Sequence, residues 1–291
     1  MLLGSLGISA MATLVHALAG RCDWEVVATV RAGLALIISG ALAVHAGAPL
    51  VVLRPPVMWM RSLAGTVSLL CTFYALSRLP SSDVLTLTNM FPIWVTLLSW
   101  PLAGIAPTKG AWLAVAVGIA GVVLVAQPRF DDGGLFPILV AITASFSTSI
   151  AMFGLHKLGH VDPRAIVAHF SATALVVCSS LLVLGPHDTP NRWPQSSQAL
   201  LILAGVGVCA TAGQLFLTKA FAAGPPARVS VVALTQVAFA MIFETIFFGH
   251  AFAPESLLGI VLVLAPTAWL LATQRRPNLA DLSNEPPAQY D

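Results

Sequence analysis

FYALSRLPSSDVLTLTNMFPIWVTLLSW, residues Phe73 to Trp100, decides how this chain folds. One apolar helix is expected to end near Leu79, and after a turn at Pro80 a second apolar helix runs on from Val84. A helix needs roughly 20 apolar residues to cross a bilayer. The stretch therefore predicts two membrane-spanning helices joined by a very short loop.

The second of these helices carries polar residues at mid-membrane depth. Polar groups are costly there unless they face other helices or water. A proline in a helix leaves the carbonyl of the preceding turn without its donor, so a kink is expected at Pro92. These residues indicate a polar path through the membrane: Thr86, Thr88, Asn89, Pro92 and Thr96.

The same pattern returns half a chain later. FLTKAFAAGPPARVSVVALTQVAFAMIFETIFFGH, Phe216 to His250, is again a helix, a Gly/Pro turn and a helix with mid-membrane polar residues. When Pro80 is aligned with Pro225, Gly104 falls on Gly249. An internal repeat in a membrane chain favours a transporter built from two halves.

Composition places the whole chain in a membrane. Hydrophobic residues make up 57% and charged residues 9%, whereas soluble domains carry about 25% charged residues. A net charge of +2 without a basic cluster gives no indication of nucleic-acid binding. The four cysteines show neither CxxC spacing nor a disulfide framework, so no metal, redox centre or other cofactor is expected.

The chain has room for about ten crossings at roughly 25 to 30 residues each. An Ala-Leu-Ala sequence ends the first apolar run, but no positive region precedes that run, so a membrane helix is favoured over a cleaved signal. The helices are expected at Met1–Ala19, Val26–Ala46, Trp59–Leu79, Val84–Gly104, Trp112–Ala126, Leu135–Leu155, Ala165–Leu184, Ala199–Ala222, Ala227–Gly249 and Ser256–Thr273.

A polar segment separates the halves. Gln127 to Gly134 is rich in turn residues and forms the expected seam. The division is therefore a first half at 1–130, a second half at 131–273, and a charged, Pro-rich tail at 274–291 that is expected to be disordered and cytoplasmic. In the helix expected at Trp112–Ala126, the small residues Gly118 and Gly121 are expected to allow close approach of a neighbouring helix.

The basic residues set the orientation. Cytoplasmic loops carry an excess of Lys and Arg. With both termini in the cytoplasm, nine basic residues fall inside and four outside, leaving Arg31 within the membrane. Five helices per half is an odd number, so the halves must enter the membrane from opposite sides, as inverted repeats. The inside set is Arg54, Arg61, Lys109, Lys157, Arg164, Lys219, Arg228, Arg275 and Arg276; the outside set is Arg21, Arg78, Arg129 and Arg192.

Three of these segments, Tyr74–Gly104, Gly118–Gly121 and Thr235–His250, resemble the EamA family of the drug/metabolite transporter superfamily. The resemblance covers nearly the whole chain. It implies an all-α integral membrane protein with ten transmembrane helices in two inverted five-helix repeats. It also implies cytoplasmic termini, a plasma (inner) membrane location and a central cavity that opens alternately to each side. The chain departs from the family pattern at His16, where a lysine is common, and at Glu244, where a small residue is common.

The candidate substrate-binding residues are polar or aromatic groups at membrane depth. Asn89 lies nearest the middle of its helix and can both donate and accept hydrogen bonds. For Arg31, two interpretations stay open: its side chain snorkels to the interface, or it faces a cavity. The full set is Asn89, Thr86, Tyr74, Trp94, Gln214, Gln236 and Arg31.

Glu244 is the only acidic residue well within an expected span. A carboxyl group buried in apolar surroundings can carry a proton, which coupling to a proton gradient requires. Glu244 is therefore the coupling candidate, with protons as the coupling ion. The alternative is a partly hydrated carboxylate paired near the membrane surface.

A transporter is the favoured function and no enzymatic activity is expected, but two alternatives stay open. The favoured transporter is a secondary one, which carries a small polar metabolite (an amino acid, amine, nucleoside-like compound or drug) by alternating access. The first alternative is an intramembrane enzyme, which would need a nucleophile with a positioned base or paired carboxylates. The second is a membrane scaffold, whose polar groups would only hold helices together.

Overall fold

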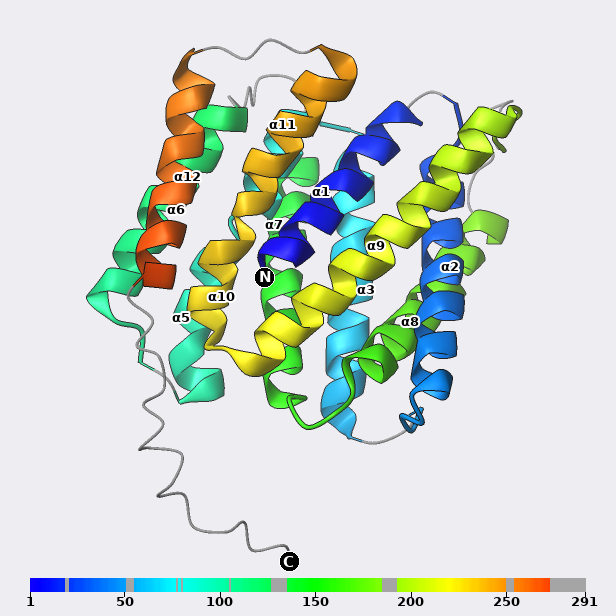
Figure 1. Ribbon diagram of the computed structural model, residues 1–291, viewed down its shortest axis with the longest axis horizontal. Coiled ribbons are helices and arrows are strands. Elements are labelled where there is room, and N and C mark those ends of the chain that lie inside the picture. Colours follow the sequence, from blue (N-terminus) through cyan, green and yellow to red (C-terminus); the bar gives the residue numbers. More distant parts are fainter. Residues whose placement is uncertain are drawn as a thin grey trace, which may run out of the picture.

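The computed structural model describes residues 1–18, 21–50, 55–76, 78–79, 81–104, 106–126, 135–184, 193–249 and 254–272. Within these ranges the regular structure is entirely helical (Figure 1). The expected seam at 127–134 and the tail from 274 lie outside the described residues. The helices are α1 Leu2–Ala17, α2 Trp24–His45, α3 Pro56–Leu76, α4 Ser81–Thr88, α5 Phe91–Ala103, α6 Lys109–Ala126, α7 Leu135–Lys157, α8 Pro163–Leu184, α9 Ser197–Ala223, α10 Pro226–Ala233, α11 Thr235–Phe248 and α12 Pro254–Ala272.

Two of the expected helices are interrupted. Only Asn89 and Met90 separate α4 from α5, and only Leu234 separates α10 from α11. Each pair therefore continues as one rod; α10 and α11 together run for 23 residues, which is enough to cross a membrane. Aside from these breaks, every helix end lies within three residues of its expected position.

The first break follows from the sequence, because Pro92 cannot donate to the carbonyl of the preceding turn. The kink expected there takes the form of an interruption just before Pro92, which lies in the first turn of α5. The second break was not expected. No proline lies within α11, and α10 has prolines only at its start.

The rods associate in pairs of distant segments. Helix α3 packs on α7, α1 on α9, α2 on α8 and α6 on α12. Figure 1 shows the α6–α12 pair at the left edge of the molecule and the α2–α8 pair at the right, with the broken helix α10/α11 and α1 between them. The broken helix α10/α11 and α1 therefore lie between these two pairs.

Glycines bring paired helices into backbone contact. A Cβ on Gly121 of α6 would lie 2.6 Å from the carbonyl oxygen of Gly259 on α12. A Cβ on Gly213 of α9 would lie 2.9 Å from the backbone nitrogen of Ile8 on α1. The close approach expected at Gly121 is confirmed, because a side chain there would separate the helices.

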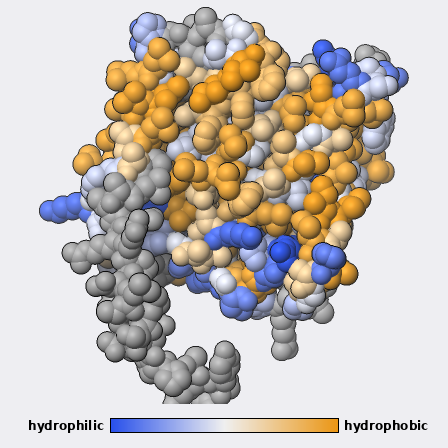
Figure 2. Space-filling view, in the orientation of Figure 1, coloured by the Kyte–Doolittle hydropathy of each residue, from blue (hydrophilic) through white to orange (hydrophobic). Residues whose placement is uncertain are grey.

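The outer surface suits a bilayer. Figure 2 shows hydrophobic residues across the middle of the face in view, with hydrophilic residues gathered toward its upper and lower ends. Large apolar side chains such as Ile37, Val183 and Trp100 are each about two-thirds or more exposed. Soluble proteins rarely expose many such side chains in one continuous patch. Five rods have the length and composition of membrane spans, and α1, α6 and α12 add shorter apolar helices. The chain is an integral membrane protein.

Candidate functional site

The two broken helices meet through their polar residues. Nε2 of Gln236, in the first turn of α11, donates a 2.6 Å hydrogen bond to Oδ1 of Asn89, at the α4–α5 break. Asn89 is 2% exposed, and its Nδ2 donates to the carbonyl of Leu85 at 2.8 Å. The side chain of Asn89 thus stabilises its own interrupted helix and bridges to the second one.

Helix α1 stabilises the other break. Ser9 Oγ donates to the Gln236 carbonyl at 2.6 Å, and Ser5 Oγ to the Ala233 carbonyl at 3.3 Å. Hydroxyls from a neighbouring helix are one means by which a membrane protein satisfies backbone groups freed by a broken helix. Ser5 thus bonds the carbonyl directly before the break and Ser9 a carbonyl just after it, so α1 contacts both sides of the interruption.

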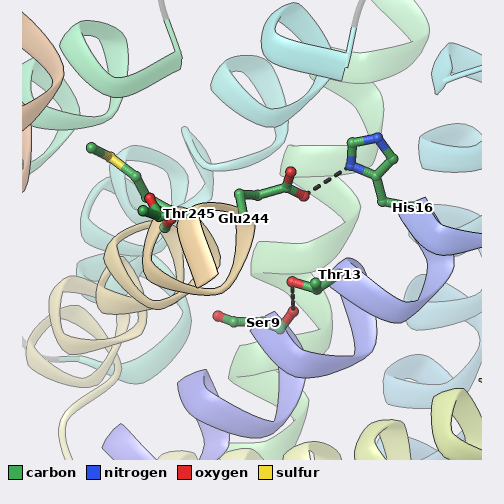
Figure 3. A network of polar contacts seen from close by, with 6 residues as sticks. Ser9, Thr13, His16, Glu244 and Thr245 are labelled. Carbon is green, nitrogen blue, oxygen red and sulfur yellow. Dashed lines mark hydrogen bonds and ion pairs between the residues drawn. The ribbon is translucent and has the colours of Figure 1, made fainter. Parts of the chain in front are cut away.

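The polar face of α1 continues from this break to Glu244. Ser9 and Thr13 are buried at successive turns of α1, and His16 follows one turn later. Figure 3 shows Glu244 of α11 and His16 pointing toward one another, with Thr245 on the other side of α11. His16 Nδ1 lies 2.8 Å from Glu244 Oε1, and the two side chains are 60% and 23% exposed. Glu244 is therefore a paired, partly exposed carboxylate.

A second polar cluster is built around Arg61 of α3. Its side chain is 1% exposed, Nη2 donates to Gln214 Oε1 of α9 at 3.3 Å, and its Cζ lies 4.4 Å from the ring centroid of Phe170 on α8. Gln214 and Phe170 also line a small cavity together with Arg31 of α2. Arg31 is therefore one of the residues that line this cavity.

The remaining candidates lie in other contacts. Trp94 Nε1 donates to Ser145 Oγ at 3.0 Å. The ring of Tyr74 packs edge-on against Phe136, with Arg78 5.8 Å from its centroid. Thr86 is buried one turn before Asn89. The structure thus joins Asn89 with Gln236 and places Arg31 with Gln214, while Tyr74, Trp94 and Glu244 make different contacts.

Three participants were not among the candidates. Arg61 had been grouped with the basic residues of the cytoplasmic ends, because it follows closely on Pro55 and Pro56. Ser9 is one of several small polar residues in α1 and carries no distinctive local signal. The third is His169, whose Nδ1 lies 2.8 Å from Ser62 Oγ, with both side chains buried. This pair joins helices 107 residues apart, so no sequence motif marks it.

Comparisons with known proteins agree with this architecture. The sequence model of the EamA-like transporter family matches residues 1–127 and 135–272. The pseudopaline exporter CntI of Pseudomonas aeruginosa is 23% identical over 281 residues, covering 94% of this chain and 95% of the exporter. A solved crystal structure superposes with a TM-score of 0.82 at 18% identity, covering 94% of this chain and 98% of that one, which shows a shared fold.

Two further relatives are shorter matches. An uncharacterized transporter of Helicobacter pylori is 24% identical over 207 residues, covering 70% of this chain and 69% of its own length. The riboflavin transporter of Rhizobium johnstonii is 23% identical over 201 residues, covering 69% of this chain and 65% of its own. The family match spans both halves of the bundle, and these relatives are named as transporters. The chain belongs to the EamA-like transporter family.

Proposed function

We propose that the protein is a secondary transporter that carries a small polar metabolite across the membrane by alternating access. The Asn89–Gln236 hydrogen bond is the observation that carries this proposal. It links two interrupted helices in the interior of an apolar bundle. Interrupted helices in corresponding positions of two halves are the best indication of a transporter's binding site.

We infer further that residues 1–130 and 131–273 form two repeats of inverted topology. The alignment of Pro80 with Pro225 brings Asn89 onto Leu234, so both interruptions occupy one repeat position. Gly104 and Gly249, also aligned, end α5 and α11 with φ of 66° and 63°. These left-handed helix ends are the kind that glycine adopts without strain.

Helix packing supports the same symmetry. Each broken pair counts as one rod. When every helix is replaced by the one five rods further along the chain, returning to the start after the last rod, the α1–α9 contact becomes the α7–α3 contact. The same replacement carries the α2–α8 and α6–α12 contacts onto themselves. An odd number of rods per repeat gives the inverted topology, and the bias of basic residues favours cytoplasmic termini in a plasma (inner) membrane.

The interruptions suit rocking between two states. A hinge is formed by the few residues at element ends that absorb a change in backbone angles, and Asn89, Met90 and Leu234 hold such positions. A substrate carrying donors and acceptors could replace the Asn89–Gln236 hydrogen bond without leaving either amide unsatisfied. The site would thereby favour polar solutes such as amino acids, amines or nucleoside-like compounds.

We propose that proton coupling occurs at Glu244. The Glu244→Gln change keeps the shape of the side chain but removes its ability to carry a charge and release a proton. In proteoliposomes we expect this variant to lose any stimulation of uptake by an imposed pH gradient, while exchange of solute at equal pH continues. Full gradient-driven uptake by the variant would exclude Glu244 as the coupling group.

Among the described residues, the Ser62–His169 pair favours the enzyme alternative, since a nucleophile needs a base within hydrogen-bond reach. We assign the pair a packing role, because Trp59 packs edge-on against His169 with ring centroids 4.7 Å apart. A Ser62→Ala variant is therefore expected to transport solute at close to the wild-type rate. Its melting temperature should fall by no more than a few degrees. Complete loss of activity in a folded Ser62→Ala protein would reopen the enzyme alternative.

A further inference from the structure

Arg61 is a buried positive charge in a membrane-spanning helix. It lies five residues after the start of α3, and its side chain is 1% exposed, so it does not reach the surface as a snorkelling arginine would. A charge at such a position costs several kcal/mol unless it is paired. The group that neutralises the charge of Arg61 therefore indicates the function of this part of the bundle.

The partners of Arg61 among the described residues are too few. A guanidinium has five N–H donors. One of them reaches Gln214 Oε1 at 3.3 Å, the Phe170 ring receives the charged face, and Nε has no partner among the described residues. Within the same part of the chain, ion pairs join only His16 with Glu244 and Asp162 with Arg164. Neither acid compensates Arg61.

Arg31 adds a second positive charge beside the same residues. It lines a small cavity together with Phe170 and Gln214, the two side chains that contact Arg61. Arg61 and Arg31 thus share two neighbours, Arg61 through direct contact and Arg31 through the cavity that they line together. Nearby like charges repel each other, and an anion bound close to them would offset that repulsion.

Two glycines leave the space that the Arg61 side chain occupies. A Cβ on Gly154 of α7 would lie 2.9 Å from Arg61 Cβ, and a Cβ on Gly65 would collide with Arg61 Nη1 and lie 2.9 Å from the Phe170 ring. Side chains at these positions would displace the guanidinium. The space for Arg61 is therefore built by the helices that surround it.

We propose that Arg61 and Arg31 bind an oxyanion, a carboxylate or phosphate group, carried by the transported solute. This inference rests on the proposed transport function and narrows its substrate class to anionic metabolites. The planar guanidinium fork matches the oxygens of both groups. Gln214 orients the fork of Arg61, and Phe170 shields the charges from lipid. An occupied site supplies acceptors that the described residues do not offer to Arg61.

Binding is tested on the purified full chain by thermal unfolding with succinate or inorganic phosphate. Neutral succinamide, and sodium chloride at equal ionic strength, serve as controls. A bound ligand raises the melting temperature by mass action. Succinate or phosphate should stabilise the wild type beyond both controls, and which of them does so tells a carboxylate from a phosphate site.

The variants decide whether Arg61 is responsible. Arg61→Gln should weaken the apparent affinity at least tenfold, and Arg61→Lys should retain part of it, because the charge remains while the fork is lost. Lys219→Gln removes an equal charge from the exposed surface of α9 and should behave as wild type. If Arg61→Gln does not fold, Arg31→Gln takes its place with the same expectation. The inference is overturned if neither anion stabilises the wild type beyond the controls, or if Arg61→Gln keeps the wild-type shift.

Flux in proteoliposomes separates this inference from the transport proposal. Arginine-dependent binding of an anion that is never transported would retain the anion site and contradict transport. Uptake of an amine or nucleoside that is the same in wild type and Arg61→Gln would retain transport and overturn the anion site.

Discussion

Replacing Asn89 or Gln236 with alanine is expected to abolish transport while the protein remains folded in the membrane. Each change removes one partner of the 2.6 Å hydrogen bond that joins the two interrupted helices. In Gln236→Ala the buried Oδ1 of Asn89 loses its donor, a loss of about 1–3 kcal/mol. Each change also removes a group that we assign to solute binding. The measurement is uptake in proteoliposomes, with melting temperature as the check on folding.

The matched control is Thr143→Ala. Thr143 lies on the exposed side of α7, and its hydroxyl donates to the Leu139 carbonyl of its own helix. Loss of this hydroxyl should leave uptake unchanged. Wild-type transport by both Asn89→Ala and Gln236→Ala would contradict the site assignment.

A Gly213→Ala substitution should destabilise the protein strongly. The added Cβ would lie 2.9 Å from both the backbone nitrogen and Cγ1 of Ile8, so α1 must move away from α9. Such overpacking costs typically about 1–3 kcal/mol. Since α1 also supplies Ser5 and Ser9 to the α10–α11 break, its displacement should lower the melting temperature by several degrees and reduce uptake together.

Gly40→Ala on α2 is the matched control for this change. A Cβ there would meet nothing within 4 Å, and alanine favours the helix more than glycine does. This variant should melt at or above the wild-type temperature. Equal melting temperatures for the two variants would contradict the close approach of α1 and α9.

Local sequence predicted what depends on local chemistry. Apolar runs of sufficient length indicated the helices, and Pro92 marked the first interruption because its missing N–H is a property of the residue itself. The polarity of Asn89 and Gln236 at mid-helix was also visible in the sequence. Their pairing was not, because it depends on how two helices 147 residues apart are placed in the bundle.

Features stabilised by tertiary contacts could not be predicted. The break at Leu234 has no proline, and the carbonyls beside it are bonded by Ser5 and Ser9 from the opposite end of the chain. Arg61 looked like an interfacial residue from its distance to the start of its helix. Only packing against Phe170 and Gln214 shows it as a buried charge.

The central claim is that the path beside Asn89 opens to each side of the membrane in turn. Thr86, buried one turn before Asn89 on α4, is suited to report this. The Thr86→Cys substitution is introduced into a background in which the four native cysteines are changed to serine: Cys22, Cys71, Cys178 and Cys209.

Labelling of this variant by a membrane-impermeant thiol reagent is then measured from the outside and from the inside of oriented vesicles. Ile37→Cys, at a position 67% exposed on the apolar surface of α2, is the control that should stay unlabelled from either side. Alternating access predicts that the thiol introduced by Thr86→Cys reacts from both sides. Reaction from one side alone, or from neither, would contradict it.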